Sequence, residues 1–460
     1  MRKNNVDMLS GSITKGLLSL TIPIMVMNVA QVLFSLFDMT ALRIFANDRA
    51  VGAVGVSGVL VALFTSLLVG ISAGANVVIA KRIGSAELER ADRATTTSLL
   101  FSVVGGLFLM TFGIVFANPF LRLINCHESL IYDAVAYFRL YFLGIPFAML
   151  YNFSASILRA IGDAKRPMYY LIIGCVVKCV FTIILTAFFH LGVLGVGIAT
   201  IISNLVSCLL CLYTLIRGQN IIHFKFKRMK FDFKEFKEIL FIGIPTGFQS
   251  ALYSLANVVI TAAVNSFGAD ATTGVSIANQ FDGILYHISY APSLAIAPYV
   301  AQNVGAHNFK RARQAYLRAV YITIGFGASL GALSAIFSAQ LSSIMSSTPA
   351  VIAFSQQKMI IVSSTYFICG INEVSGGVLR GLERPIVPTV ATLIFMCVLR
   401  FIWVYAVFPL CPNLTFLYTV WPIGWVLCII TELCFYFPTI AKLQRQSRER
   451  EVAGCMPQNQ

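Results

Sequence analysis

Polar side chains inside apolar stretches are the residues of this sequence whose types and spacing could do chemistry. Four of them, spaced by three or four residues in one apolar segment, are Asn28, Gln31, Ser35 and Asp38. A helix places residues at this spacing on one face. A carboxyl group in apolar surroundings takes up a proton more readily than in water. Asp38, with Gln31 and Asn28 beside it, is our candidate for binding a proton or a sodium ion. The alternative is a structural ion pair with Arg43.

Further polar residues lie in apolar segments of the second half, where we expect them to line a substrate cavity. They are Gln249, Tyr253, Asn257, Gln280, Asp282, Tyr286, Asn372 and Glu373. Tyr290 lies in one of these segments, and Glu432 lies in the last apolar segment, Leu414–Ile440. Asp282 is the better match for Asp38 in depth. Glu373 lies near Arg380 in the sequence, so it could instead serve as an ion-pair partner.

Two cations, Lys178 and Arg400, lie in the middle of apolar segments. A cation at the centre of a membrane costs at least ~3 kcal/mol unless it is paired. Each is therefore expected either to form an internal ion pair or to contact the substrate. If both faced the cavity, they would oppose a purely cationic substrate.

Composition predicts the elements that carry these residues. Of the 460 residues, 58% are hydrophobic and 12% are charged, which is half the charged fraction of a soluble domain, about 25%. Lipid must therefore be the solvent for most of the chain, and each span needs about 20 apolar residues. The twelve predicted spans are Lys15–Ala46, Val51–Ser72, Thr95–Ala117, Val135–Ser156, Met168–Phe189, Val193–Leu215, Phe236–Phe267, Thr273–Ala297, Ala315–Leu341, Ala353–Val374, Ile386–Phe408 and Leu414–Ile440.

Basic residues predict the orientation of the spans. The 34 Lys and Arg, which contribute to a net charge of +15, gather at both termini and in alternate connections. Such enrichment is typical of cytoplasmic loops that face anionic lipid, so we expect membrane lipids and not nucleic acid as partners. Both termini are then cytoplasmic. The few cations assigned to the opposite connections are Arg43, Arg49, Arg122, Arg139 and Lys358.

The chain also repeats itself. The Ile-Pro pair at 22–23 recurs at 244–245, which is 222 residues later, and the segment Ala80–Ala91 recurs as Ala301–Ala312. We therefore predict an all-α polytopic membrane protein with twelve transmembrane helices in two pseudo-symmetric six-helix lobes. The predicted parts are an N-lobe over 1–216, a basic cytoplasmic linker over 217–236, a C-lobe over 237–441 and a cytoplasmic tail over 442–460.

Other motifs indicate structure and not chemistry. Cys208 and Cys211 form a CxxC in an apolar segment with no second pair, so we expect helix packing and no metal site. The five His occur in no HExxH, and the sequence has no GxxxxGK[ST]; neither a membrane enzyme nor an ATP-driven pump is indicated. Glycines such as Gly327 and Gly331 are expected to let helices approach closely.

Four motifs together resemble the multidrug and toxic compound extrusion family, the MATE transporters. The first span carries Pro23, Gln31 and Asp38, and the end of the tenth reads GGVLRG from Gly376 to Gly381. The opening of the sixth span, LGVLGVGIAT, and the repeated segments after spans two and eight are also similar to family motifs. The resemblance covers both halves of the chain.

The resemblance implies export of bulky, often cationic organic compounds in exchange for protons or sodium, through two lobes that flank a central cavity. It implies no cofactor beyond the coupling ion, and a bacterial plasma membrane. We expect a monomer. Some branches of the family carry an acid on the seventh span or an Asp on the fifth. This chain instead has Gln249, Tyr253 and Asn257 on the seventh and Lys178 and Thr182 on the fifth.

Other functions remain open as alternatives. A flippase for lipid-linked precursors, from the wider superfamily, is the first, and the cations Lys178 and Arg400 favour it. A major-facilitator carrier would need a different basic loop after its second span. A membrane enzyme, or a receptor that transports nothing, would not explain duplicated lobes with acids inside their spans.

Overall fold

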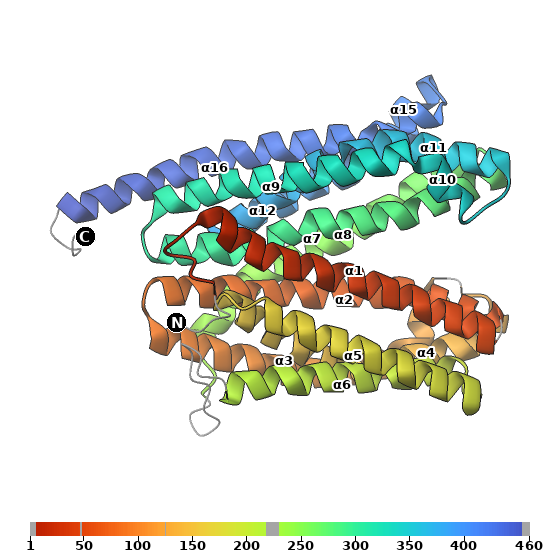
Figure 1. Ribbon diagram of the computed structural model, residues 1–460, viewed down its shortest axis with the longest axis horizontal. Coiled ribbons are helices and arrows are strands. Elements are labelled where there is room, and N and C mark those ends of the chain that lie inside the picture. The colour runs from red at the N-terminus through yellow and green to blue at the C-terminus, as the bar shows by residue number, and fades with distance from the viewer. Residues whose placement is uncertain (1–5, 47, 125, 218–229, 453–460) are drawn as a thin grey trace. The chain divides into compact units, whose positions relative to one another are not determined.

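The computed structural model of the chain is helical throughout the residues that it describes, 6–46, 48–124, 126–217 and 230–452 (Figure 1). The helices are α1 (Ile13–Phe45), α2 (Asp48–Gly84), α3 (Leu88–Leu123), α4 (Glu128–Ala160), α5 (Lys165–Ile183), α6 (Val193–Arg217), α7 (Phe233–Asn265), α8 (Ala269–Gly305), α9 (Phe309–Ile336), α10 (Ser338–Ser343), α11 (Pro349–Val362), α12 (Tyr366–Gly381), α13 (Ile386–Thr392), α14 (Leu399–Ile402), α15 (Leu414–Tyr418) and α16 (Val420–Val452).

All twelve predicted spans coincide with these helices, so the all-α polytopic membrane fold is confirmed. Nine helical stretches of the described residues are long and apolar enough to cross a membrane. The other three predicted spans fall on α7, on α8 and on the consecutive helices α11 and α12. Several helices run beyond the predicted ends, as α8 does, because backbone hydrogen bonding continues where the apolar side chains stop.

The described chain divides into two compact units that exchange short segments. The first unit comprises 1–6, 23–79 and 87–247, and the second comprises 7–22, 80–86 and 248–460. Helices α1, α2 and α7 therefore each contribute to both units. The lobe boundaries predicted at 216 and 237 stay a prediction. Most of the predicted linker, residues 218–229, and the end of the predicted tail, residues 453–460, lie outside the described residues.

Within each unit the helices pack side by side. In the first unit, α4 packs against α3 and α6, and α5 runs beside α6 (Figure 1). In the second, α12 packs against α8, α9 and α16, and α8 also packs against α11. Helices α5, α8 and α12 carry several of the polar residues that the sequence singled out, so this packing decides which of those meet.

Within the described residues, three short π-helical segments interrupt the spans that carry Lys178 and Arg400. Ile184–Phe188 follows α5, the helix of Lys178. Leu393–Val398 and Trp403–Val407 bracket α14, the helix of Arg400. A π segment widens the turn by one residue and is frequent at functional sites. Such wider turns therefore lie on both sides of Arg400 and on the C-terminal side of Lys178.

The segment before α1 is held within the second unit by Arg311 of α9. The Arg311 guanidinium donates to the backbone carbonyls of Met8, Ser10 and Gly11. Partial burial acts to raise the pKa of Asp7. Hydrogen bonds from the Ser10 hydroxyl and from two backbone amides, together with the charge of Arg311, outweigh it and hold that pKa below its ordinary value. The segment is thus a folded part of this unit.

Close helix approach at glycines is confirmed in the second unit. A Cβ built on Gly331 of α9 would lie 2.2 Å from the carbonyl oxygen of Ser363, and one on Gly327 would lie 2.8 Å from the Cα of Phe367. No real Cβ tolerates such distances, so only glycine fits there. Small residues of this kind let helices pack where lipid offers no hydrophobic drive for association.

We predict that Gly331→Ala lowers the melting temperature of the purified protein. The added Cβ forces α9 away from the Ser363 turn at a cost of about 2 kcal/mol. Gly325→Ala on the same helix is the matched control, because nothing lies within 4 Å of its Cβ position. Helix propensity should leave that variant as stable as the parent or slightly more so. Equal melting temperatures for the two variants would contradict the packing argument.

Candidate functional site

The first unit contains an ion pair between Asp38 of α1 and Lys178 of α5. The Lys178 ammonium contacts Oδ2 of Asp38, and the Thr182 hydroxyl donates to Oδ1 at 3.5 Å. Asp38 is 6% exposed. Lys178 and Thr182 are one helical turn apart, so a single face of α5 serves both carboxylate oxygens. The described partner of Asp38 is thus Lys178 and not Arg43.

The remaining members of the polar face on α1 differ in exposure. Asn28 is buried with Asp38, whereas Gln31 and Ser35 are exposed. Beyond Asp38, the side chains of Leu42 and Tyr137 belong to a buried apolar cluster, with Tyr141 packed against it. The carboxylate therefore lies between an apolar cluster and a more open stretch of the helix.

The second unit contains a similar pair, Asp282 of α8 and Lys358 of α11. The Lys358 ammonium lies 2.9 Å from Oδ2 of Asp282 and also donates to Asn279, and the Ser363 hydroxyl donates to Oδ1 at 3.0 Å. Lys358 is 2% exposed. This corrects the prediction that placed Lys358 in a connection: it is a span residue. Its position in an apolar segment was the available signal, the same one that marked Lys178.

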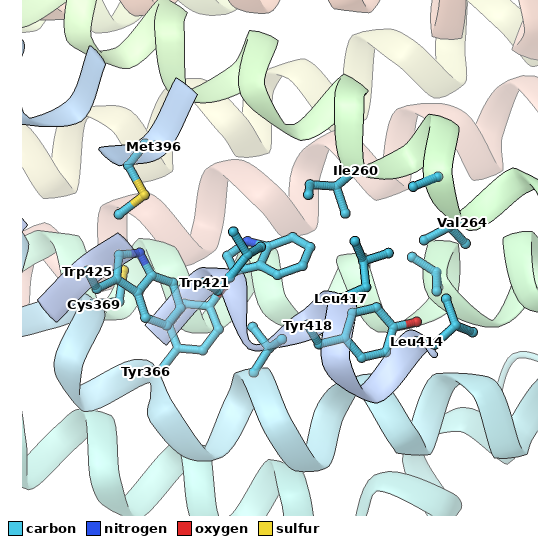
Figure 2. Close-up of a cluster of buried hydrophobic side chains, with 14 of the residues drawn as sticks. Ile260, Val264, Tyr366, Cys369, Met396, Leu414, Leu417, Tyr418, Trp421 and Trp425 are labelled. Carbon is cyan, nitrogen blue, oxygen red and sulfur yellow. The ribbon is translucent and has the colours of Figure 1, made fainter. Parts of the chain in front are cut away.

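A pocket of about 300 Å³ opens beside this second pair. Four predicted residues line it: Tyr253, Asn257, Asp282 and Tyr286. The lining residues that sequence reasoning missed include Asn279, Lys358, Tyr366 and Trp421. Figure 2 shows Trp421 among Trp425, Tyr366 and the turn at Leu417, in the buried apolar cluster of this unit. The pocket therefore combines a charged edge with aromatic walls.

Arg400 lies behind the pocket wall and is fully buried. Its Nη1 donates to Oδ1 of Asn257 at 2.7 Å. Its Cζ lies 5.3 Å from the ring centre of Tyr253 and 5.2 Å from that of Trp421. Among the described residues it forms no ion pair with an acid. Arg400 and Lys178 thus occupy matching positions in the repeat but have different partners.

The other predicted cavity residues form a second polar cluster or lie apart. The Tyr286 hydroxyl donates to Glu373 at 3.4 Å, and Arg380 donates to Gln249 at 3.2 Å. Glu373 forms no ion pair with Arg380 or Arg384 within the described chain. Asn372 and Glu432 each have one buried side-chain oxygen with no hydrogen-bond partner among the described residues. Gln280 is exposed.

Charged groups are rare inside membrane spans, so the Lys–Asp pairs at Asp38 and Asp282 and the arginine Arg400 are candidate functional groups. A carboxylate so paired can exchange its ammonium partner for a proton or a metal cation. No group of three or more His, Cys, Asp or Glu that could hold a metal ion occurs among the described residues.

The MatE family model matches residues 23–184 and 245–406, which is well over half of the chain. This chain belongs to the MatE family. The two matched segments begin 222 residues apart, the offset of the internal repeat. The resemblance seen in the motifs of both halves is confirmed, and the MatE chain is a multi-pass membrane transporter.

Curated relatives align with most of this MatE protein. It is 26% identical over 390 residues to the probable multidrug resistance protein YoeA of Bacillus subtilis, covering 83% of this chain and 84% of that one. It is 25% identical over 402 residues to the FAD transporter of Shewanella oneidensis, covering 85% and 87%. A crystal structure of MATE in the straight conformation shares its fold, with a TM-score of 0.90, 20% identity and coverage of 97% and 100%.

We predict that Asp38→Asn lowers the melting temperature of the purified transporter, because it leaves the partly buried Lys178 ammonium without its carboxylate partner. The expected cost is about 3 kcal/mol. The double variant Asp38→Asn with Lys178→Met should recover most of the loss. The control is Glu449→Gln in the pair Arg445–Glu449, whose side chains are 83% and 62% exposed; its effect should stay below about 0.5 kcal/mol. A double variant no more stable than Asp38→Asn would show that the pair contributes nothing.

Proposed function

We propose that the protein is an antiporter that exports organic compounds, often cationic ones, in exchange for protons or sodium by alternating access. The observation that carries the proposal is the pair of the buried Asp38 carboxylate with Lys178. A carboxylate at this depth is costly to keep charged, and such groups mark ion pathways in membrane proteins. The names of several relatives, including the probable multidrug resistance protein YoeA, support export of drugs.

Exchange of partners at Asp38 would supply the coupling. A proton or sodium ion that reaches the carboxylate removes its attraction for Lys178, and the ammonium then needs a new arrangement of α1 and α5. The ion binds best to one conformation and the substrate to the other. This difference in affinity between conformations is what allows an ion gradient to drive substrate export. Gln31 and Asn28 remain proposed members of the same ion path.

The cellular setting is part of the proposal. The distribution of Lys and Arg favours cytoplasmic N- and C-termini, and the bacterial relatives favour a bacterial plasma membrane. We propose a monomer that contacts membrane lipids and takes small organic molecules as substrates. The lipid-linked precursor flippase is the alternative, because Arg400 adds positive charge near the pocket of the second unit. The relative named an FAD transporter also widens the substrates to be considered.

The test is transport in proteoliposomes loaded with a fluorescent organic cation, with proton and sodium gradients imposed separately. We expect one gradient to accelerate transport by the parent protein at least about tenfold, and Asp38→Asn to remove that acceleration, since the ion loses its carboxylate. Asp270→Asn is the matched control, because Asp270 is an exposed acid in the first turn of α8. It should transport like the parent.

Three results bear on the proposal. Transport that neither gradient accelerates, by protein shown to be folded, would contradict the antiporter and bring the flippase forward. Normal gradient-driven transport by Asp38→Asn would keep the antiporter but move the coupling site to Asp282 or Glu373. Loss of transport in both Asp38→Asn and the control would point to damage unrelated to the carboxylate.

A further inference from the structure

The pocket of the second unit has little capacity for a cation. Asp282 is the one acid among its described lining residues, and both of its oxygens are engaged. Lys358 lies 2.9 Å from Oδ2, and the Ser363 hydroxyl donates to Oδ1 at 3.0 Å. A cationic substrate would have to displace a buried ammonium to reach this carboxylate. The charged edge of the pocket is therefore already neutral without a ligand.

The aromatic walls are also occupied by cations of the protein. Lys358 Nζ lies 5.5 Å from the ring centre of Trp421, and the Arg400 Cζ lies 5.2 Å from the same ring. Arg400 also faces the ring of Tyr253 at 5.3 Å. A ring attracts a cation through its negative face. Lys358 and Arg400 already interact with these rings, so the rings attract a cationic ligand less strongly.

Arg400 leaves an excess of positive charge behind the pocket. Its side chain is fully buried, it forms no ion pair within the described chain, and its Nε has no hydrogen-bond partner there. Its bonds go to the neutral groups Asn257 and Met396. A buried cation without an anion is costly. An anion bound in the pocket would relieve that cost.

The bond from Arg400 also fixes the amide of Asn257. Because Oδ1 accepts from the guanidinium at 2.7 Å, the amide nitrogen with its two N–H donors is left for other partners. Asn257 lines the pocket, so these donors are available to a ligand there. The bond from Arg400 thus leaves the amide of Asn257 as a hydrogen-bond donor at the pocket wall.

Glu373 is a further acid of this unit, and it is not among the residues that line the pocket. It accepts from the hydroxyl of the lining residue Tyr286 at 3.4 Å. Its own backbone carbonyl accepts from Ser293, which in turn accepts from Arg380 at 2.7 Å. Glu373 and Arg380 therefore belong to one polar cluster, in which the acid has a cation close by.

We propose that this pocket binds the anionic group of an aromatic substrate, a carboxylate or a phosphate, through the amide of Asn257 and the charge of Arg400. Trp421, Tyr366 and Tyr253 would pack against the aromatic part. The inference rests on the proposed transport function and specifies its substrates: aromatic molecules with an anionic group, zwitterions included. Phosphate and carboxylate share this chemistry, and the experiment separates them.

The test is equilibrium binding to the full-length protein in nanodiscs, with no gradient present. One probe pair is a rhodamine carboxylate and its methyl ester, which differ only in the anionic group; binding is read from fluorescence anisotropy. The second pair is naphthyl phosphate and naphthol, measured by competition. We expect the carboxylate to bind about tenfold more tightly than the ester, the ratio typical of one charge-assisted hydrogen bond. Naphthyl phosphate should compete better than naphthol if phosphate is also accepted.

Two variants test the residues named. Arg400→Gln should bring the carboxylate-to-ester ratio to about one, chiefly by weakening the carboxylate. Arg318→Gln is its control, because it also removes one cation, from an exposed position on α9. If Arg400→Gln does not fold, Asn257→Asp takes its place. An aspartate keeps an acceptor for Arg400 but adds a negative charge, so the ester should then bind more tightly than the carboxylate.

The outcomes separate this inference from the proposed function. Equal or tighter binding of the ester by the parent protein overturns the inference, as does an unchanged ratio in both Arg400→Gln and Asn257→Asp. If the binding assay shows no preference for the carboxylate, but the proteoliposome assay shows gradient-driven transport of the ester, the antiporter is kept and the anionic site is rejected. A clear preference for the carboxylate without gradient-driven transport of either probe keeps the anionic site and rejects the antiporter.

Discussion

The cost of placing charge inside apolar spans is the constraint on which the rest of this structure depends. A charged side chain there is usually paired with an opposite charge, hydrogen-bonded or used for a function. Lys178 is paired with Asp38, and Lys358 is paired with Asp282. Each pair joins two helices, α1 to α5 and α8 to α11. The pairs therefore link neighbouring helices, and the proposed function assigns to the first of them the binding of the coupling ion.

The two halves share a repeat but differ in how they solve this problem. Lys178 pairs with the acid Asp38. Arg400, at the matching position, contacts the amide of Asn257 and the rings of Tyr253 and Trp421. The acid of the second half lies on a different helix of the repeat and pairs with Lys358 instead. Duplication thus preserved the place of the cation while the partners diverged. The first unit thus contains a carboxylate paired with a lysine, and the second contains a pocket beside an arginine that forms no ion pair within the described chain.

Backbone geometry supports this arrangement of side chains. Glycines at helix contacts, such as Gly331 against Ser363 and Gly377 against Ser293, bring neighbouring helices close enough for short polar side chains to meet. Ser363 then reaches Asp282, and Ser293 reaches both Glu373 and Arg380. A π segment follows Lys178 on its helix, and another precedes Arg400, so the helix is locally wider near each of these cations. Close packing and local widening together position groups that the sequence keeps far apart.

The sequence alone determined the class of the protein, because lipid demands long apolar helices and these leave a direct mark on composition. The twelve spans, the repeat and the family followed from apolar length, charge distribution and motif order. Asp38, Lys178, Asp282 and Arg400 stood out for the same reason: a charge in an apolar span is visible without a structure. Their partners were not visible. Asp38 and Lys178 are 140 residues apart in sequence, and only the packing of α1 against α5 joins them. The role of Lys358, the neutral partner of Arg400 and the aromatic walls were likewise decided by tertiary contacts, since spacing along one helix says nothing about which face of another helix it meets.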